Sequence, residues 1–130
     1  MDREHVARWI AAYEDAWRAP GTDALPGIFT LGSTYLQGPY EELVVGLPAI
    51  ARMWDGERAG PDEVFQMASE IIAVDGDTAV VRVDVSYGDP AAEEYRDLWL
   101  VRFAADGRCA SFEEWPFWPE KPLAAEPEPR

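Results

Sequence analysis

The chain has 130 residues, a length that suits one domain, and its 11 Lys and Arg against 25 Asp and Glu give a net charge of −14. This charge disfavours nucleic acid and anionic membrane surfaces, because their phosphates would be repelled, so we expect neither as a partner. Cys109 is the single cysteine, which excludes an intrachain disulfide and a multi-cysteine metal site. We therefore expect no metal, no other cofactor and a reducing, cytoplasmic location.

An amphipathic helix is predicted from Arg3 to Arg18. Apolar residues recur there at spacings of three and four, which places them on one stripe: Val6, Trp9 or Ile10, Tyr13 and Trp17. Pro20-Gly21 ends this helix. A short second helix follows, capped by Thr22 or Asp23 and running through Phe29.

A short strand, Thr34–Gln37, comes next and ends at Gly38-Pro39. The pattern then predicts a third helix, Pro48–Glu57, that buries Ile50, Met53 and Trp54. We expect this helix to end near Gly56 and Gly60-Pro61.

The rest of the ordered chain reads as an antiparallel meander. Its strands are Val64–Val74, Thr78–Tyr87, Glu94–Phe103 and Arg108–Trp118, and the turns hold Asp75-Gly76-Asp77, Gly88-Asp89-Pro90 and Asp106-Gly107. A Pro- and Glu-rich tail over residues 119–130 is expected to be disordered, leaving one domain over residues 1–118. This order predicts an α+β fold in which about three N-terminal helices pack on one face of a curved antiparallel sheet.

Four segments of the chain together resemble the nuclear transport factor 2-like superfamily. They are Tyr13 to Trp17, Asp23-Ala-Leu-Pro-Gly-Ile-Phe, Gly46-Leu-Pro-Ala-Ile, and the Asp106-Gly-Arg hairpin before Glu114-Trp115. SnoaL-like polyketide cyclases, ketosteroid isomerases and limonene epoxide hydrolases share this order of elements. The resemblance implies a cone-shaped fold with a pocket between the first helix and the sheet, which usually holds a small hydrophobic molecule. Function must still be argued from the site.

Ketosteroid isomerase chemistry does not fit this chain. Its helix tyrosine matches Tyr13, but its base falls at Gln37 or Gly38 and its oxyanion aspartate falls at Trp99. Two of the three acid–base roles are therefore missing. Tyr13 is left with two interpretations: a buried aromatic residue with a satisfied hydroxyl, or a hydroxyl that contacts the ligand.

The limonene epoxide hydrolase pattern fits better. The resemblance places Tyr35 and Gln37 on the attacking water, Glu114 as the base, Asp84 as the acid and Arg82 between the two carboxyl groups. Epoxide opening needs one carboxylate to take a proton from water and a second carboxyl group to give one to the leaving oxygen. Gln37 and Glu114 are each one methylene longer than the family's residues.

The strand Thr78–Tyr87 leaves the direction of these charges open. If its Val residues face the pocket, Arg82 and Asp84 face outward, and the epoxide hydrolase alignment requires the reverse, because a slip of one residue exchanges the two faces of a strand. Both alignments place Glu114 inside. Asp97 lies on the same strand face as Trp99, and we expect it at the rim of the pocket.

The sequence thus predicts a mostly apolar cavity of roughly 300 Å³ or more. The residues expected to line it are Tyr13, Trp17, Trp54, Trp99 and Phe112. Leu98 and Leu100 give the other face of the sheet an apolar centre, which predicts a homodimer through the sheet. Two functions stay open: an acid–base enzyme of epoxide hydrolase or polyketide cyclase type, or a ligand-binding or assembly protein without catalysis.

Overall fold

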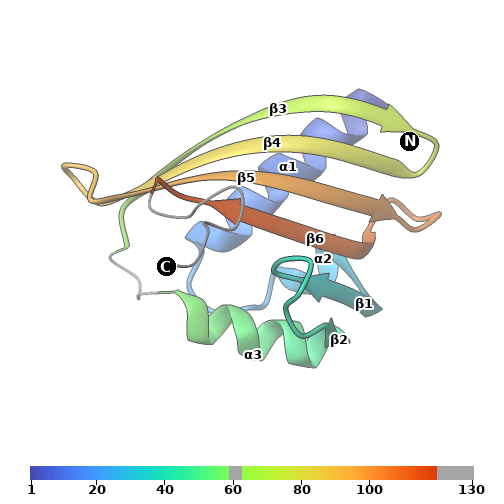
Figure 1. Cartoon of the computed structure of the whole chain (residues 1–130). Helices are drawn as coiled ribbons and strands as arrows, with labels where there is room; N and C mark the ends of the chain where they lie inside the picture. The colour runs from blue at the N-terminus through green and yellow to red at the C-terminus, as the bar shows by residue number, and fades with distance from the viewer. Residues whose placement is uncertain (59–62, 120–130) are drawn as a thin grey trace, which may run out of the picture.

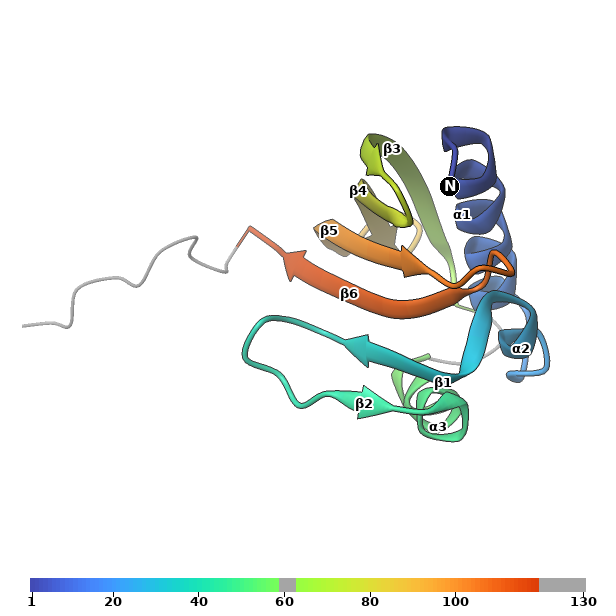
Figure 2. The same ribbon diagram turned by 90° about the vertical axis from the view of Figure 1, so that its right-hand side faces the viewer.

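The first helix, α1 (Arg3–Arg18), lies along the concave side of a curved sheet in a computed structural model that describes residues 1–58 and 63–119 (Figures 1 and 2). Asp2 caps the helix, since its side chain accepts a hydrogen bond from the His5 backbone N–H at 2.8 Å. The helix ends at Arg18 because Pro20 follows. The predicted bounds are confirmed, and the apolar stripe faces the sheet.

The segment after α1 differs from the prediction. Helix α2 (Leu25–Ile28) is a single turn, and β1 (Phe29–Leu36) begins directly after it. The predicted strand, Thr34–Gln37, is therefore only the second half of β1, and the two-residue strand β2 (Val44–Val45) was not predicted. Long-range pairing explains the difference, because Phe29 lies opposite Cys109 of the last strand.

Helix α3 (Leu47–Glu57) agrees with the predicted third helix. It starts after Gly46, whose φ of 91° is open to glycine without strain, and Pro48 occupies the first turn. Ile50 and Trp54 are buried, whereas Met53 is only partly buried. The predicted stop at Gly60-Pro61 lies outside the described residues.

The meander is confirmed, and each of its bounds agrees with the prediction to within one residue. Its strands are β3 (Phe65–Asp75), β4 (Thr78–Tyr87), β5 (Glu93–Phe103) and β6 (Cys109–Phe117). The six strands run in the order β2-β1-β6-β5-β4-β3, and every pair is antiparallel except β1–β6, which is parallel. Apart from residue 119, the predicted tail lies outside the described residues. No helix in the described ranges is long and apolar enough to cross a membrane.

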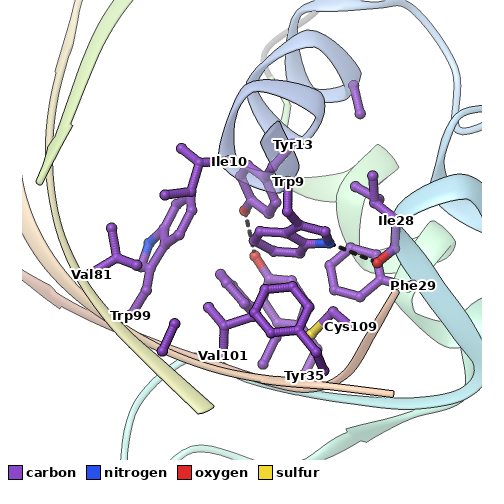
Figure 3. Packing of buried hydrophobic residues seen from close by; sticks show 14 of the residues in the cluster. Trp9, Ile10, Tyr13, Ile28, Phe29, Tyr35, Val81, Trp99, Val101 and Cys109 are labelled. Carbon is purple, nitrogen blue, oxygen red and sulfur yellow. Dashed lines mark hydrogen bonds between the residues drawn. The ribbon is translucent and has the colours of Figure 1, made fainter. Parts of the chain in front are cut away.

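Aromatic rings fill the space between α1 and the sheet (Figure 3). Trp9 lies at the centre, with its ring 5.9 Å from that of Phe29, 5.7 Å from Phe103 and 5.8 Å from Phe112. Its indole N–H donates to the Ile28 carbonyl at 2.9 Å, so burial leaves no polar atom of Trp9 unsatisfied. The core thereby ties α1 to α2, β1 and the meander.

Strand β1 offers a matched test of this packing. Phe29 is fully buried, whereas Leu31 on the same strand is 72% exposed. We expect Phe29→Ala to lower the free energy of unfolding by about 3–5 kcal/mol and Leu31→Ala to change it by less than about 0.5 kcal/mol. Urea unfolding of both variants measures this difference. Equal losses would show that Phe29 is not part of the packed core.

Candidate functional site

A cavity of about 670 Å³ opens between α1, α3 and the concave face of the meander. Tyr13 and Trp17 reach it from α1, Trp54 from α3, and Trp99 from β5. Six of its lining residues carry carboxyl groups: Glu57, Glu63, Asp89, Glu93, Asp97 and Glu114. The wall is therefore much more acidic than the mostly apolar cavity that the sequence predicts.

Three side-chain oxygens meet at the inner wall of the cavity. The hydroxyls of Tyr13 and Tyr35 lie 2.8 Å apart, as the dashed line in Figure 3 shows. Both hydroxyls also point to Oε2 of Glu114, at 3.5 Å from Tyr13 and 3.3 Å from Tyr35. Burial raises the pKa of both tyrosines well above the usual range, so the hydroxyls stay protonated and serve as donors.

Glu114 holds its proton more tightly than an ordinary glutamate. Burial raises its pKa to about 8, and the charge of Asp97 acts in the same direction, while the two tyrosine hydroxyls oppose the shift. Each hydroxyl has one proton, so when Glu114 is ionised one tyrosine donates to the hydroxyl of the other, and the second tyrosine donates to Oε2 of Glu114. Protonated Glu114 adds a third proton to the group, which frees one hydroxyl to donate to a bound molecule.

Asp97 is the second buried acid of the cavity, although the sequence placed it at the rim. It is only 8% exposed, and its Oδ1 has no hydrogen-bond partner within the described residues. Burial raises its pKa to about 7; the nearby indole N–H of Trp99 opposes the shift, and the charge of Asp84 adds to it. The alternation of β5, with Trp99 and Val101 facing inward, is the signal that places Asp97 inside.

The register of the sheet brings Asp97 and Glu114 together. Trp99 lies opposite Glu114 and Asp97 lies opposite Pro116, so the two acids occupy adjacent positions on the concave face of β5 and β6. The cavity therefore holds a close pair of carboxyl groups, both with raised pKa values. Such pairs share one proton over the pH range between their two titrations.

Arg82 and Asp84 do not reach this pair, so the predicted epoxide hydrolase arrangement is wrong at these positions. Val81 lies opposite Trp99, which places Val81 inside and Arg82 on the convex face. The Arg82 side chain is 63% exposed and pairs with Glu70 of β3 at 3.7 Å. Asp84 is also exposed. The buried Val residues of β4 fix this direction, because a one-residue slip would expose all of them.

The other predicted site residues divide into two groups. Trp17, Trp54 and Trp99 line the cavity, as do Tyr35 and Gln37, whose amide donates to Glu57 at 3.3 Å. Phe112 does not line it; the ring is fully buried behind Tyr13, with the two centroids 5.5 Å apart. Phe112 is thus part of the core that supports the cavity wall. Among the described residues, no group of three or more His, Cys, Asp or Glu is placed to hold a metal.

Residues 8–112 match the family model of the SnoaL-like domain. No curated protein matches the chain at a significant level.

Solved structures share the fold over most of the chain. A proposed polyketide cyclase from Sinorhizobium meliloti is 27% identical, with 82% of this chain and 93% of that chain covered and a TM-score of 0.63. A proposed ketosteroid isomerase from Kribbella flavida is 21% identical, with 98% and 84% covered and a TM-score of 0.66. An epoxide hydrolase of the LEH-like type from M. tuberculosis is 12% identical, with 88% and 84% covered and a TM-score of 0.66.

The buried acids should make stability depend on pH. Because folding raises the pKa of Asp97 from 3.8 to about 7 and that of Glu114 from 4.5 to about 8, the folded state binds these protons more tightly than the unfolded state. Their contribution is fully present below the unfolded pKa values and is lost as the pH rises to about 8. We expect the double variant Asp97→Asn/Glu114→Gln to lose less stability than wild type between about pH 5 and 8.5, by on the order of 1–3 kcal/mol.

Urea unfolding at the two pH values measures this loss. The matched control is Asp75→Asn/Glu42→Gln, which removes the same charge from exposed residues that do not line the cavity. The control should lose stability as wild type does. Equal curves for the two double variants would show that general charge repulsion, and not the buried pair, causes the pH dependence.

Proposed function

The chain belongs to the SnoaL-like domain family, and we propose that it is an acid–base enzyme acting on a small, largely apolar carbonyl compound. The observation that carries this proposal is the pair Asp97 and Glu114 on one wall of the cavity, with the two tyrosine hydroxyls bonded to Glu114. Removal of a proton next to a carbonyl needs a carboxylate base and a donor for the developing oxyanion. The cavity offers both.

The contacts of the two acids suggest the roles. Glu114 is bonded to both tyrosine hydroxyls, whereas Oδ1 of Asp97 has no hydrogen-bond partner within the described residues, so we assign the proton of the singly protonated pair to Glu114, where it completes the donor group. Asp97 is then the base, and the protonated group of Glu114, Tyr13 and Tyr35 is the donor. In ketosteroid isomerases the base position corresponds to Gln37 or Gly38, whereas here the carboxylate comes from β5.

The proposed reaction begins with the carbonyl oxygen accepting a hydrogen bond from the tyrosine hydroxyls. Asp97 takes the proton from the adjacent carbon, and the C–H electron pair forms the enol double bond as the carbonyl oxygen becomes an enolate stabilised by the donor. Return of the proton from Asp97 to another carbon gives an isomer. Attack of the enolate on a second carbonyl of the same molecule closes a ring, and the new alkoxide takes its proton from the donor.

The aromatic wall supports the choice of a largely apolar substrate. Trp17 and Trp54 pack edge to face with their centroids 4.8 Å apart, and Tyr13 lies 5.1 Å from Trp54. These rings form one continuous surface from α1 to α3 beside the acids. A ring system bound there would displace water from the carboxyl groups and strengthen their interactions.

Epoxide opening is the second candidate reaction. It is favoured by the position of Tyr35 and Gln37, which line the cavity with Glu114 and would hold a water beside that carboxylate. Glu114 would take a proton from the water, the hydroxide would attack carbon, and Asp97 would give its proton to the leaving oxygen. This route needs Glu114 ionised and Asp97 protonated, which is the reverse of the protonation that the first reaction needs.

Deuterium incorporation next to the carbonyl tests the first reaction without knowledge of the natural substrate. A panel of cyclic ketones in deuterated water is followed by NMR, and a panel of small epoxides is followed for diol formation. We expect exchange in the ketone panel, a fall of about 100-fold or more for Asp97→Asn, and a smaller fall, of about tenfold or more, for Glu114→Gln. The rate should be highest between about pH 7 and 8, where Asp97 is ionised and Glu114 is protonated.

Matched controls separate this result from a general loss of charge. Asp75→Asn and Glu42→Gln change exposed carboxyl groups that do not line the cavity, and both should exchange like wild type. Diol formation without exchange would replace the first reaction by the second. A folded wild-type protein that binds the ketones and transforms neither panel would be a ligand-binding protein.

We also propose that the chain forms a homodimer through the convex face of the sheet. Leu98 and Leu100 of β5 face outward there, and Trp115 of β6 lies opposite Leu98. An apolar centre on a surface otherwise rich in charge is typical of an interface. Sedimentation at micromolar concentration should give about twice the mass of one chain, and Leu98→Arg should halve it. A wild-type monomer that persists at tenfold higher concentration would contradict the dimer.

A further inference from the structure

The charged residues that line the cavity all have the same sign. Six lining residues carry carboxyl groups, and no Lys, Arg or His stands among the described residues of the wall. None of these six acids takes part in a salt bridge within the described part of the chain. Glu57 accepts a hydrogen bond from Gln37 and Glu93 accepts one from Tyr95, so their known partners are neutral.

Two arginines near the cavity have their polar partners outside its wall. Arg58 donates to the carbonyls of Ala19 at 2.7 Å and Gly21 at 2.6 Å, pairs with Asp55 at 3.2 Å, and lies over the rings of Trp17 and Trp54 at 5.8 and 5.7 Å. Arg18 pairs with Glu14 at 2.9 Å and covers the Phe65 ring. These arginines tie helices and strands to one another and leave the cavity carboxyl groups uncompensated.

Asp97 adds an independent sign that the cavity takes a ligand. More than nine-tenths of this residue is buried, it lines the cavity, and its Oδ1 has no hydrogen-bond partner in the described chain. A buried carboxylate oxygen without a partner is costly, and a cation in the cavity would remove that cost.

The aromatic rings beside Asp97 are suited to the same kind of ligand. Tyr87 and Tyr95 line the cavity with their ring centroids 5.9 Å apart, and both are partly exposed, as is Trp17, whereas Trp54 and Trp99 are fully buried. The π faces of tryptophan and tyrosine attract ammonium groups, most strongly where water is excluded, and rings combined with a carboxylate form the usual cage for quaternary ammonium ions.

We propose that the cavity selects a small apolar molecule that carries a cationic amine, with the ammonium group held between Asp97 and the rings of Tyr87 and Tyr95. The proposal deepens the proposed function, on which it rests for the assignment of this cavity as the substrate site. It also excludes anionic substrates, since a carboxylate or phosphate would enter a wall of six acids without a paired cation.

The preference for a cation is tested by comparing benzyltrimethylammonium with neopentylbenzene, its neutral carbon isostere, because the two ligands have the same shape and differ in charge. Binding is measured by tryptophan fluorescence at about pH 8, where Asp97 is ionised. We expect the cation to bind at least about tenfold more tightly than the isostere, and 3-phenylpropanoate to bind more weakly than either.

Variants identify the group responsible. Asp97→Asn should reduce the affinity for the cation by about tenfold or more and leave the affinity for the isostere nearly unchanged. Asp75→Asn, which removes an equal charge from an exposed position outside the cavity, should leave both affinities unchanged. If Asp97→Asn does not fold, Asp97→Glu and the wild-type comparison of the two ligands still decide the question.

The outcomes separate this inference from the proposed function. Equal binding of the cation and the isostere by wild type overturns the cation preference. An equal effect of Asp97→Asn and Asp75→Asn also overturns it, because the effect would then reflect only the net charge. A protein that exchanges ketone protons but shows no preference for the cation fails only this inference. A protein that prefers the cation and transforms no substrate fails only the proposed reaction.

Discussion

The packing of α1 against the concave side of the sheet determines both the core and the cavity. In the first part of the helix, Trp9 is surrounded by aromatic rings and leaves no space against the sheet. One and two turns later, Tyr13 and Trp17 line the cavity on the side toward α3. The same apolar stripe thus supplies stability at one end and a binding wall at the other, so the wall has the rigidity of the core.

Burial of the two carboxyl groups works against that stability. Desolvation is the largest cause of the raised pKa of both Asp97 and Glu114, which means that each group is costly in its charged form. Glu114 is offset in part by two tyrosine donors, whereas Oδ1 of Asp97 has no such partner. Proteins retain such a costly buried carboxyl group where it has a function. The missing partner of Oδ1 therefore marks Asp97 as the more reactive of the two acids.

The sequence was informative wherever local patterns decide the structure. Period-two alternation and the Asp-Gly turns defined the meander. The alternation of β4 left two directions open for Arg82 and Asp84, and the buried Val81 and Val83 show that both charges face outward. The extent of β1 and its parallel pairing with β6 depend on contacts between residues about 80 positions apart, which no local pattern shows.

The sequence analysis placed Phe112 in the cavity wall, whereas the structure places it in the core. Strand alternation predicts that the Phe112 side chain faces inward, but it does not distinguish a core position from a position in the cavity wall. Asp97 was visible in the alternation of β5, but its burial follows from how the sheet curves around it.

One proton connects the proposed reaction with the proposed ligand. Between the two titrations, Asp97 and Glu114 share a single proton, and the charge of Asp97 raises the pKa of Glu114. An ammonium group beside Asp97 would take the place of that proton on Asp97 and stabilise its carboxylate. The proton would then stay on Glu114. Protonated Glu114 leaves one tyrosine hydroxyl free to donate a hydrogen bond to the substrate. Binding of a cationic substrate would therefore leave Asp97 ionised as the base and Glu114 protonated as the acid. A neutral substrate would leave the proton distributed between the two carboxyl groups.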